Sequence, residues 1–522
     1  MTSRRCSKAR RVLRWLCLAP LVPLVWACNA RPFEAPTVKP QTTFGNTFQA
    51  SLNRELDLLF MIDNSSSMSS AQDNLRANMP SFMNVLKGLP GGLPDLHLAV
   101  VTSDMGVGPT DAADQLVQGC GATGDDGAFQ AAPTGGCTAT GLDPGATFLV
   151  DSGGTTEKTN FGNQDITTVF QCITALGASG CGFEHQLASI VHALGADNVV
   201  AGKPTPPMSN AGFLRDEAYL GIVLLTNEDD CSAPSDSPLW TPPSQSLAST
   251  YGPTQNFVCN EFGHLCVPPT GGPAAPPSRL APTGSPADMV TYSPAAGPDN
   301  CVSAEGQGML TPVGAGGFAD QIKALKGDPA NQILVASISG PTTPYTVTWA
   351  TPPTPDIGPW PSVQASCGTH ADMSKPFADP GVRLLQFVGQ FGGHGLFYPF
   401  CSTDYSPALT DIGNAFRQLL GPKCVTGTVA NRPGTDHPDC TVTDVSGGAQ
   451  TVVHACADDP ATPCWTLDPG TGALGAGGNG CTADEQLLDV MRGGADPTAG
   501  TKSVVECSLC VSGQHDPSRG CP

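Results

Sequence analysis

Asp63, Ser65 and Ser67 are the residues of this chain whose types and spacing point most directly to chemistry. They form a D-x-S-x-S pattern that directly follows the apolar segment 58–62. A carboxylate and two hydroxyls on one short loop offer three hard oxygen ligands that can face one small cation such as Mg²⁺. The alternative interpretation is a helix N-cap, in which the same oxygens accept hydrogen bonds from free backbone N–H groups.

The elements that must position this loop follow from hydrophobic periodicity. Continuous apolar runs predict buried strands, and apolar repeats of three and four residues predict amphipathic helices. The predicted strands are 58–62, 96–102, 219–225 and 333–338, and the predicted helices lie around 75–86, 166–173, 187–194 and 409–419. Their alternation predicts a doubly wound, mostly parallel α/β sheet. Ligands of such sheets bind outside the carboxyl ends of the strands, which is where Asp63 stands.

Residues 55–422 resemble a von Willebrand factor type A (VWA) domain, whose metal-ion-dependent adhesion site (MIDAS) begins with D-x-S-x-S. In that family a second loop supplies a Thr and a third loop supplies an Asp; here Glu184 and Asn227 fall at those places. The resemblance therefore implies a metal site formed by Asp63, Ser65, Ser67, Glu184 and Asn227. It also implies Mg²⁺, or else Mn²⁺ or Ca²⁺, with one coordination position left for a carboxylate of a protein partner.

Three further acidic residues lie at the same predicted edge. Asp104 ends its strand and is a candidate hydrogen-bond support for the metal ligands, although Asp at such a place also starts ordinary turns. Asp229 and Asp230 have the same candidate role. Together with Glu228 they form an acidic cluster, which we expect to face water rather than a second cation because no EF-hand spacing is present.

The N-terminus has the pattern of an export signal. Residues 1–27 combine six arginines and lysines with a short apolar run, and Ala27-Cys28 resembles the cleavage site of bacterial lipoproteins. This resemblance implies a lipidated Cys28 that anchors the protein to a membrane; an ordinary cleaved signal peptide is the alternative. Residues 29–54 carry three prolines and no hydrophobic periodicity, so we expect them to form a tether.

Cysteine usage supports export. Of 21 cysteines, eighteen follow residue 28, and ten of these precede residue 402 while eight follow residue 423. Even counts of this size are typical of disulfides in an exported protein, here in the periplasm or at the cell surface. We predict disulfide-pinned insertions near 105–160 and 232–315 in the α/β domain, and a small cysteine-rich module at 423–522.

Two histidine and cysteine patterns have spacings that a zinc site can use. Cys259, His264 and Cys266 lie within eight residues, but disulfides fit an exported chain better. His185 and His192 share one predicted helix, with no third zinc ligand near them in sequence. We expect structural or surface roles for both histidines.

The expected function is protein binding. Acidic residues number 46 against 25 basic ones, and the resulting net charge of −21 disfavours nucleic acid as a partner. Neither H-E-x-x-H nor G-x-S-x-G occurs, so two common hydrolase signatures are missing. We expect a non-enzymatic cell-envelope protein whose MIDAS-type site mediates adhesion or protein binding. The alternatives are the same fold with a degenerate, metal-free site, and a metal-dependent hydrolase with Glu184 or Asp104 as base.

Overall fold

The chain is described by a computed structural model over residues 43–49, 55–89, 92–107, 120–131, 142–152, 158–216, 218–234, 236–292, 301–306, 308–351, 358–372, 375–420, 423–446, 449–471, 481–491, 502–511 and 515–521. The predicted signal peptide, Cys28 with its lipid, and most of the predicted tether lie outside these residues. Among the helices within them, none has both the length and the apolar character needed to cross a bilayer.

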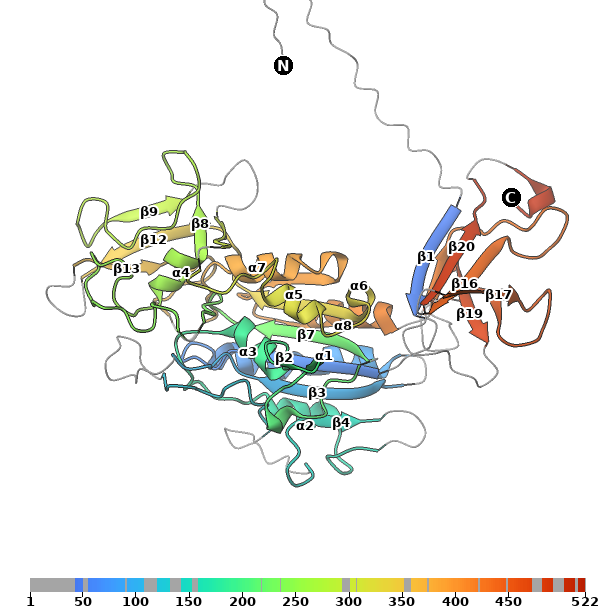
Figure 1. The fold of residues 1–522 in the computed structure, drawn as a ribbon, viewed down its shortest axis with the longest axis horizontal. Coiled ribbons are helices and arrows are strands. Elements are labelled where there is room, and N and C mark those ends of the chain that lie inside the picture. The colour runs from blue at the N-terminus through green and yellow to red at the C-terminus, as the bar shows by residue number, and fades with distance from the viewer. Residues whose placement is uncertain are drawn as a thin grey trace, which may run out of the picture. The chain divides into compact units, whose positions relative to one another are not determined.

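A six-stranded, largely parallel sheet forms the centre of the α/β domain (Figure 1). Its strand order is β14-β11-β7-β2-β3-β4, and only the edge strand β4 runs antiparallel to its neighbour. When the six strands are numbered in chain order and read across the sheet from β4 to β14, they have the order 3-2-1-4-5-6 of doubly wound sheets. The strand order reverses between the first and fourth strands, β2 and β7, and this place is the switch point of the sheet. The strands are β2 (Glu55–Ile62), β3 (Asp95–Val101), β4 (Leu149–Asp151), β7 (Tyr219–Leu225), β11 (Ile333–Ser339) and β14 (Gly395–Pro399).

Helices cover both faces of the sheet because the side chains of a strand alternate between its faces. In β2, Leu58 and Phe60 pack against one set of helices, while Leu59 and Met61 pack against the other. The first set is α1 (Ser69–Lys87), α2 (Ile166–Ile173) and α8 (Ser406–Leu420). The second set is α3 (Gln186–Ala193), α5 (Phe318–Lys323) and α7 (Val382–Gly389). The mixed α/β architecture predicted from periodicity is confirmed.

Two insertions combine into a small β-subdomain. The predicted insertion at 232–315 contributes α4 (Phe257–Gly263), β8 (His264–Cys266), β9 (Met289–Tyr292) and β10 (Cys301–Ser303). A further insertion after β11, which the sequence analysis did not predict, contributes β12 (Tyr345–Ala350) and β13 (Trp360–Val363). The strands β13, β12 and β9 form one antiparallel sheet. Tyr292 and Tyr345 of this sheet share an apolar core with Val382 of α7.

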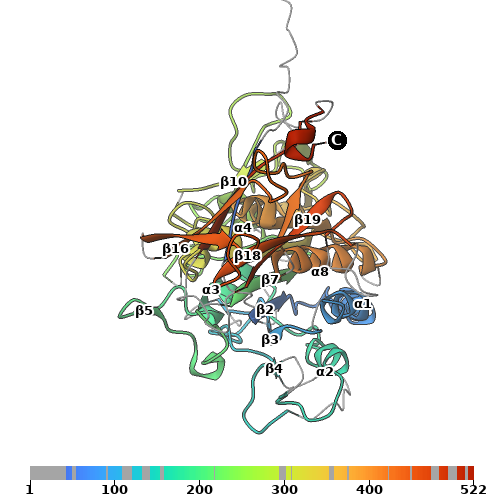
Figure 2. The ribbon, with the colours of Figure 1, turned by 90° about the vertical axis from the view of Figure 1, so that its right-hand side faces the viewer.

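The C-terminal module is a seven-stranded sheet of order β1-β20-β16-β17-β18-β19-β15. Several of its strands face the viewer in Figure 2. The strands after residue 422 are β15 (Lys423–Thr426), β16 (Cys440–Ser446), β17 (Ala449–Ala455), β18 (Cys464–Pro469), β19 (Glu485–Met491) and β20 (Lys502–Ser508). The remaining strand, β1 (Thr43–Gln49), pairs antiparallel with β20. The predicted tether 29–54 therefore contains a strand that the sequence analysis did not predict, because the edge to which it hydrogen-bonds is distant in sequence.

Eight disulfides join described cysteines, and each closes within its own group, which the even count of each group allows. In the α/β domain they are Cys120–Cys181, Cys231–Cys259, Cys266–Cys301 and Cys367–Cys401. In the C-terminal module they are Cys424–Cys481, Cys440–Cys507, Cys456–Cys464 and Cys510–Cys521. This density is typical of proteins that fold in an oxidising compartment, which supports export.

The other short elements lie in the connections. They are β5 (Val199–Val200), β6 (Lys203–Pro204), α6 (Pro329–Gln332), η2 (Met208–Asn210), η3 (Gly392–His394) and η4 (Pro517–Arg519). Of the predicted insertion at 105–160, the described parts include β4 and Cys120. None of these elements enters the site described next.

Candidate functional site

The D-x-S-x-S loop lies at the switch point of the sheet, where β2 and β7 end side by side. The backbone N–H of Asp63 donates to Leu225 O at 3.0 Å, which ties the loop to the end of β7. The Asp63 carboxylate is fully buried and accepts from the Ser65 N–H at 2.7 Å, the Ser103 hydroxyl at 3.2 Å and the Thr226 hydroxyl at 2.8 Å. Burial raises the pKa of Asp63, and these hydrogen bonds oppose the rise.

The two serine hydroxyls of the motif meet the third loop. Ser65 Oγ and Ser67 Oγ lie 3.3 Å apart, and Ser67 Oγ donates to Asn227 Oδ1 at 3.0 Å. The structure therefore brings together Asp63, Ser65, Ser67 and Asn227, four of the five predicted metal ligands. All of their facing atoms are oxygens, which are the ligands that Mg²⁺ and Ca²⁺ prefer.

Glu184 joins the same site from the second loop. It lines a cavity together with Ser65 and Ser67, and only 2% of its surface is exposed. Within the described part of the chain, no hydrogen-bond donor reaches Glu184 Oε1. Burial raises the pKa of Glu184 well above its usual range, and the neighbouring Glu228 and Asp63 add to the rise. A buried carboxyl with an unsatisfied oxygen fits a site that is completed by a cation.

Backbone hydrogen bonds fix the three loops against one another. The Gly180 N–H donates to Asn64 O at 2.8 Å and so joins the second loop to the first. The Cys231 N–H donates to Glu184 O at 2.8 Å and joins the third loop to the second. The oxygens of the site are thus held by main-chain contacts rather than by long flexible side chains alone.

Glu228 and Asp379 are site residues that the sequence analysis missed. The Glu228 carboxyl lies near that of Glu184, and burial raises the pKa of Glu228 to about 8, with Asp379 contributing. The Asp379 N–H donates to Asn227 O at 2.8 Å, and the Asp379 carboxylate lies 2.6 Å from His370 Nε2. Glu228 had a signal in the acidic run after β7 but was expected to face water; Asp379 comes from the insertion that was not predicted.

Asp229 turns away from the serine hydroxyls, contrary to its candidate role as their support. Its carboxylate lies 2.7 Å from His264 Nε2 and accepts from the N–H groups of Arg383 and Leu384 at the start of α7. Asp229 therefore binds free N–H groups at a helix N-terminus, where a negative charge is favourable.

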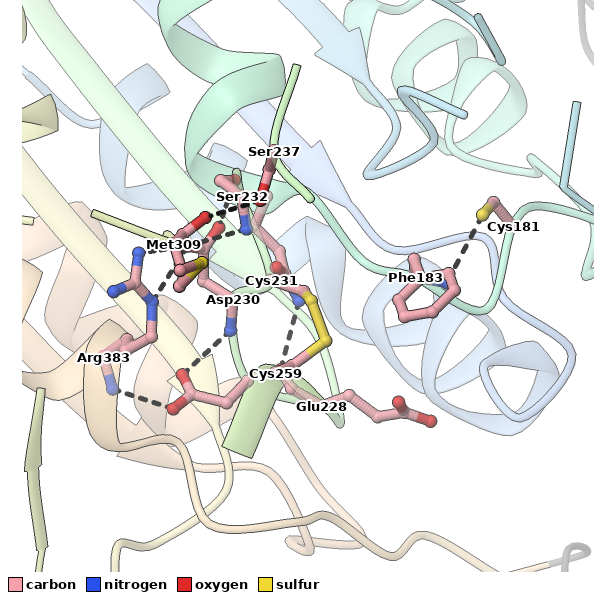
Figure 3. Close-up of a disulfide and its surroundings, with 12 residues drawn as sticks. Cys181, Phe183, Glu228, Asp230, Cys231, Ser232, Ser237, Cys259, Met309 and Arg383 are labelled. Carbon is pink, nitrogen blue, oxygen red and sulfur yellow. Dashed lines mark hydrogen bonds and ion pairs between the residues drawn. A yellow bond between two sulfur atoms is a disulfide. The ribbon is translucent and has the colours of Figure 1, made fainter. Parts of the chain in front are cut away.

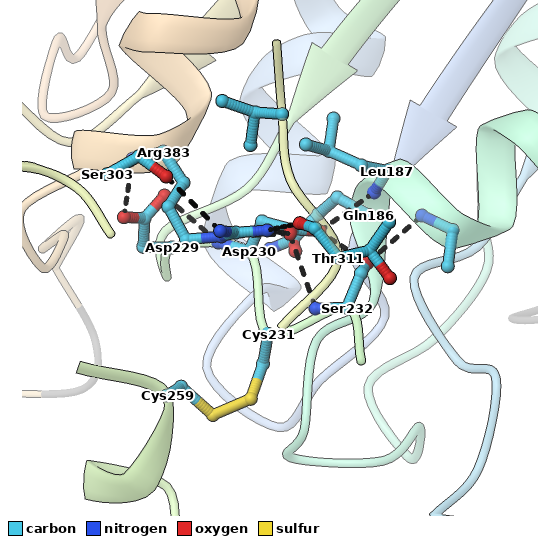
Figure 4. A network of polar contacts seen from close by, with 12 residues as sticks. Gln186, Leu187, Asp229, Asp230, Cys231, Ser232, Cys259, Ser303, Thr311 and Arg383 are labelled. Carbon is cyan, nitrogen blue, oxygen red and sulfur yellow. Dashed lines mark hydrogen bonds and ion pairs between the residues drawn. A yellow bond between two sulfur atoms is a disulfide. The ribbon is translucent and has the colours of Figure 1, made fainter. Parts of the chain in front are cut away.

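Asp230 also has a structural role, in which it links the third loop to α3 and α7. It accepts from the Leu187 N–H in the first turn of α3 at 2.9 Å, and its Oδ2 lies 2.9 Å from the guanidinium of Arg383 (Figure 4). The side chains of Arg383 and Asp230 are both buried. The expectation that the acidic cluster faces water is wrong for Asp229 and Asp230, because helix ends and a buried arginine satisfy their carboxylates.

Asp104 shapes the second loop instead of contacting the D-x-S-x-S residues. Its Oδ1 accepts from the Gly106 N–H at 3.0 Å and its Oδ2 accepts from the Cys181 N–H at 3.1 Å. Cys181 is also disulfide-bonded to Cys120. Asp104 thus anchors the segment that leads to Glu184.

The histidine and cysteine patterns have structural roles, as expected. His185 stacks on Trp240 with ring centroids 5.2 Å apart, and burial lowers its pKa to about 4. Cys259 and Cys266 both form disulfides, and Figure 3 shows the bond between Cys231 and Cys259 beside the third loop. In the C-terminal module, Glu485, Cys424 and Cys481 lie close enough together to resemble a set of metal ligands. The two cysteines form a disulfide, however, so neither sulfur is a thiolate.

A cavity of about 490 Å³ lies between the three loops and the inserted β-subdomain. The loops contribute Ser65, Ser67, Glu184 and Glu228 to its lining, and the insertions contribute aromatic side chains and His370. Its volume is within the range of small-molecule and side-chain pockets. The site is therefore a cavity partly enclosed by the insertions, rather than a flat sheet edge.

Comparisons with known proteins yield distant likenesses only. No protein family model and no curated protein matches the chain. Among solved structures, the pilus adhesin RrgA from Streptococcus pneumoniae shares 13% identity at a TM-score of 0.26, over 90% of this chain and 58% of its own. A von Willebrand factor type A protein from Catenulispora acidiphila shares 10% at 0.24, over 91% and 67% of the two chains. The human COPII-coat protein Sec24c shares 11% at 0.25, over 91% and 43%.

Proposed function

We propose that this protein is an exported, non-enzymatic interaction protein of VWA type, whose MIDAS-like site binds a divalent cation and engages a protein partner. The cation is Mg²⁺, or else Mn²⁺ or Ca²⁺, and its ligands are Asp63, Ser65, Ser67, Glu184 and Asn227. The observation that carries the proposal is the convergence of these oxygens from three loops at the switch point, with the buried Glu184 Oε1 left without a described partner.

The type A assignment has two supports. The sheet has the doubly wound order with an antiparallel edge strand, and the D-x-S-x-S motif lies at the carboxyl end of the strand that borders the switch point. Thr226 and Asn227 follow the adjacent strand β7 and contact Asp63 and Ser67. The motif and the topology therefore agree on one location for a ligand.

The rival is an interaction protein with a metal-free site. In that case a hydrogen bond between the carboxyls of Glu184 and Glu228, which requires a proton, replaces the cation. The hydrolase alternative is narrowed to Glu184 as base, because both Asp104 oxygens already accept backbone hydrogen bonds, and the proposed function uses Glu184 as a metal ligand instead.

Calorimetric titration with MgCl₂, MnCl₂ and CaCl₂ tests the metal site. The motif supplies its own matched pair: Ser67→Ala removes a proposed ligand, whereas Ser66→Ala removes an adjacent, exposed hydroxyl with no such role. We expect saturable binding in the wild type and in Ser66→Ala, and about tenfold or greater weakening in Ser67→Ala and Asp63→Ala. No binding by the wild type would favour the metal-free rival, and equal affinities of the two serine variants would exclude Ser67 as a ligand.

We further propose that Cys28 carries a lipid that anchors the exported protein to a bacterial membrane. The lipobox-like Ala27-Cys28 supports this assignment, and the disulfides agree with export. Metabolic labelling with a palmitate analogue should mark the wild type and not Cys28→Ser. Label on both variants, or on neither, would point to an ordinary signal peptide.

A further inference from the structure

The cavity beside the D-x-S-x-S loop has an excess of acid. Glu184, Glu228 and Asp379 all line it, and no lysine or arginine is among its described lining residues. Asp379 has His370 as a partner, at 2.6 Å. Among the described residues, no lysine or arginine forms an ion pair with Glu184 or Glu228; His370 is near enough to Glu228 to lower its pKa, and Figure 3 shows the Glu228 side chain pointing away from Arg383. An occupant of this cavity therefore meets several acidic side chains, and a positively charged group on it would favour their ionised forms.

Two buried polar atoms at the cavity lack partners within the described chain. One is Glu184 Oε1 on the loop side, and the other is Gln255 Nε2, contributed by the insertion. Their residues are 2% and 3% exposed, respectively. Buried polar groups are almost always satisfied, by protein, water or ligand. An acceptor on one wall and a donor on the other fit a polar ligand that donates at one end and accepts at the other.

The insertions add aromatic side chains to the same cavity. Phe257 and Phe377 are buried, and Trp360 is partly exposed, so an indole surface remains accessible to a ligand. Aromatic faces attract ammonium and guanidinium groups through the ring quadrupole. A carboxylate gains nothing from such faces and is repelled by the acidic wall.

We propose that this cavity binds a ligand carrying an ammonium or guanidinium group, such as the side chain of a basic peptide segment, with Glu228 as its charge partner and Trp360 as its aromatic contact. The inference goes beyond the proposed function and does not depend on it. A divalent cation bound by Asp63 and Glu184 is neutralised by these two carboxylates, and Glu228 remains as the acceptor. Without the metal, the cavity is still acidic. In both states the favoured ligand is cationic, so the partner carboxylate expected from the family resemblance is disfavoured.

Calorimetry with small probes tests whether the cavity prefers a positively or a negatively charged ligand. The probes are Nα-acetyl-lysine amide, Nα-acetyl-arginine amide, Nα-acetyl-glutamate amide and 1,4-diaminobutane, each titrated in MgCl₂ and in EDTA. We expect the basic probes to bind saturably in both buffers and the glutamate probe to bind in neither. Tighter binding of the amino-acid amides than of the diamine indicates a peptide ligand; the reverse order indicates a free polyamine, and either order supports an ammonium site.

Three substitutions locate the binding. Glu228→Gln should weaken the basic probes about tenfold or more, while Glu506→Gln, an exposed glutamate of the C-terminal module, should not. Trp360→Leu should weaken them several-fold, and Trp360→Phe should restore most of the affinity. Thermal unfolding of each variant verifies that the fold is intact, and the two Trp360 variants provide the test if Glu228→Gln does not fold.

Three results would overturn the inference. They are saturable binding of the glutamate probe in MgCl₂, basic-probe affinities that are equal in folded Glu228→Gln and wild type, and no binding of any basic probe up to ~10 mM. A protein that binds the basic probes but no divalent cation would retain this inference and lose the metal-dependent part of the proposed function. The two proposals therefore fail separately.

Discussion

Glu184 and Glu228 hold two carboxyl groups in one buried place, which is costly unless a proton or a cation is shared between them. Their raised pKa values have the same leading cause, burial, with nearby acids adding to it. Functional sites often concentrate such perturbed groups. At the scale of the residue, this pair supports the proposal that the cavity binds a positively charged group.

Glu184→Gln should separate the cost of burying two carboxyl groups together from the stability that a bound cation adds. Without divalent cations we expect the free energy of unfolding to rise by about 1 kcal/mol, because the variant no longer buries an ionisable group next to Glu228. With Mg²⁺ at a hundred times the dissociation constant, the wild type should gain about 2.7 kcal/mol and the variant much less. Denaturant unfolding with and without MgCl₂ measures both, with Glu506→Gln as control. A Mg²⁺ gain equal to that of the wild type would exclude Glu184 as a ligand.

Arg383 and Asp230 form a buried ion pair whose partners depend on each other. Arg383→Met leaves the Asp230 carboxylate buried without its guanidinium, and we expect a loss of about 3–5 kcal/mol in the free energy of unfolding. The double variant Arg383→Met with Asp230→Asn should recover part of this loss, because no unpaired charge remains. Urea unfolding curves measure both changes. A double variant that is less stable by the sum of the single losses would show that the pair is not coupled.

At the scale of the element, the third loop is held from several sides. Asp229 and Asp230 accept from the first turns of α7 and α3, and Cys231 is bound to Cys259 of α4. All three acids of the run 228–230 line the cavity, but these contacts occupy the carboxylates of Asp229 and Asp230 and not that of Glu228. We therefore expect the disulfide to affect the site as well as stability.

Replacing Cys231 and Cys259 together by Ser should loosen the third loop. We expect a loss of about 2–4 kcal/mol in the free energy of unfolding. We also expect weaker divalent-cation binding, because Asn227 and Glu228 lie in the same loop. The matched control is the double variant Cys456→Ser with Cys464→Ser in the C-terminal module, which should leave cation affinity unchanged. Equal cation affinities in the two double variants would show that the disulfide does not organise the site.

His192 gives α3 a pH-dependent contribution to stability. Its Nδ1 lies 2.8 Å from Asp197, and this hydrogen bond raises the His192 pKa, with Asp126 adding a smaller effect. A raised histidine pKa stabilises the fold fully below the unfolded pKa of about 6.5, and the contribution is lost as the pH rises through the higher folded pKa. The stability difference between wild type and His192→Gln should thus be largest at low pH and shrink toward alkaline pH. A difference that grows with pH in urea unfolding would contradict this assignment.

At the scale of the whole molecule, the strand β1 joins two distant parts of the sequence. Residues 43–49 pair with β20 near the other end of the chain, so the C-terminal sheet is completed by a segment that precedes the α/β domain. Without β1, the edge of β20 presents unpaired backbone groups. The C-terminal sheet is therefore built from two stretches of the chain that lie on either side of the α/β domain in the sequence.

A protein that begins at residue 51 should show this dependence. Compared with one that begins at residue 29, we expect faster backbone hydrogen exchange over Lys502–Ser508, because the N–H groups facing β1 lose their acceptors. Exchange over β7 in the α/β domain serves as the internal control and should be unchanged. Unchanged exchange over β20 would mean that β1 does not contribute to that sheet in solution.

Predictions from sequence succeeded where local pattern and tertiary environment agree. The strand β7 coincides with its predicted range 219–225 because a strand buried on both faces is continuously apolar. The strand β12 was missed because the sequence analysis predicted strands only from continuous apolar runs, whereas in Tyr345–Ala350 buried and less buried residues alternate over a short span between proline-rich loops. The strand β1 was missed because its partner lies more than 450 residues away, and no local periodicity records such a pairing.

The site divides in the same way. Asp63, Ser65 and Ser67 could be found from sequence because a single loop carries them. Asn227 follows the predicted strand 219–225 and Glu184 precedes the predicted helix 187–194, and the family resemblance assigned both to the site. The roles of Asp229 and Asp230 could not, because the direction of each side chain depends on helix ends contributed by α3 and α7. Asp379 gave no signal, since an insertion brings it to the loops across a large sequence distance.

The sequence by itself determined the alternating α/β core, the motif at the end of β2 and the grouping of cysteines, because periodicity, turn chemistry and composition are local properties of the chain. The tertiary structure alone decided which acids enter the site, that the insertions enclose it as a cavity, and that β1 completes the C-terminal sheet. These features depend on contacts between segments that are far apart in sequence. The contacts are stabilised by burial of side chains and by hydrogen bonding between strands, and neither leaves a pattern in the local sequence. The sign of the charge in the cavity, and with it the ligand we propose, belongs to this second group.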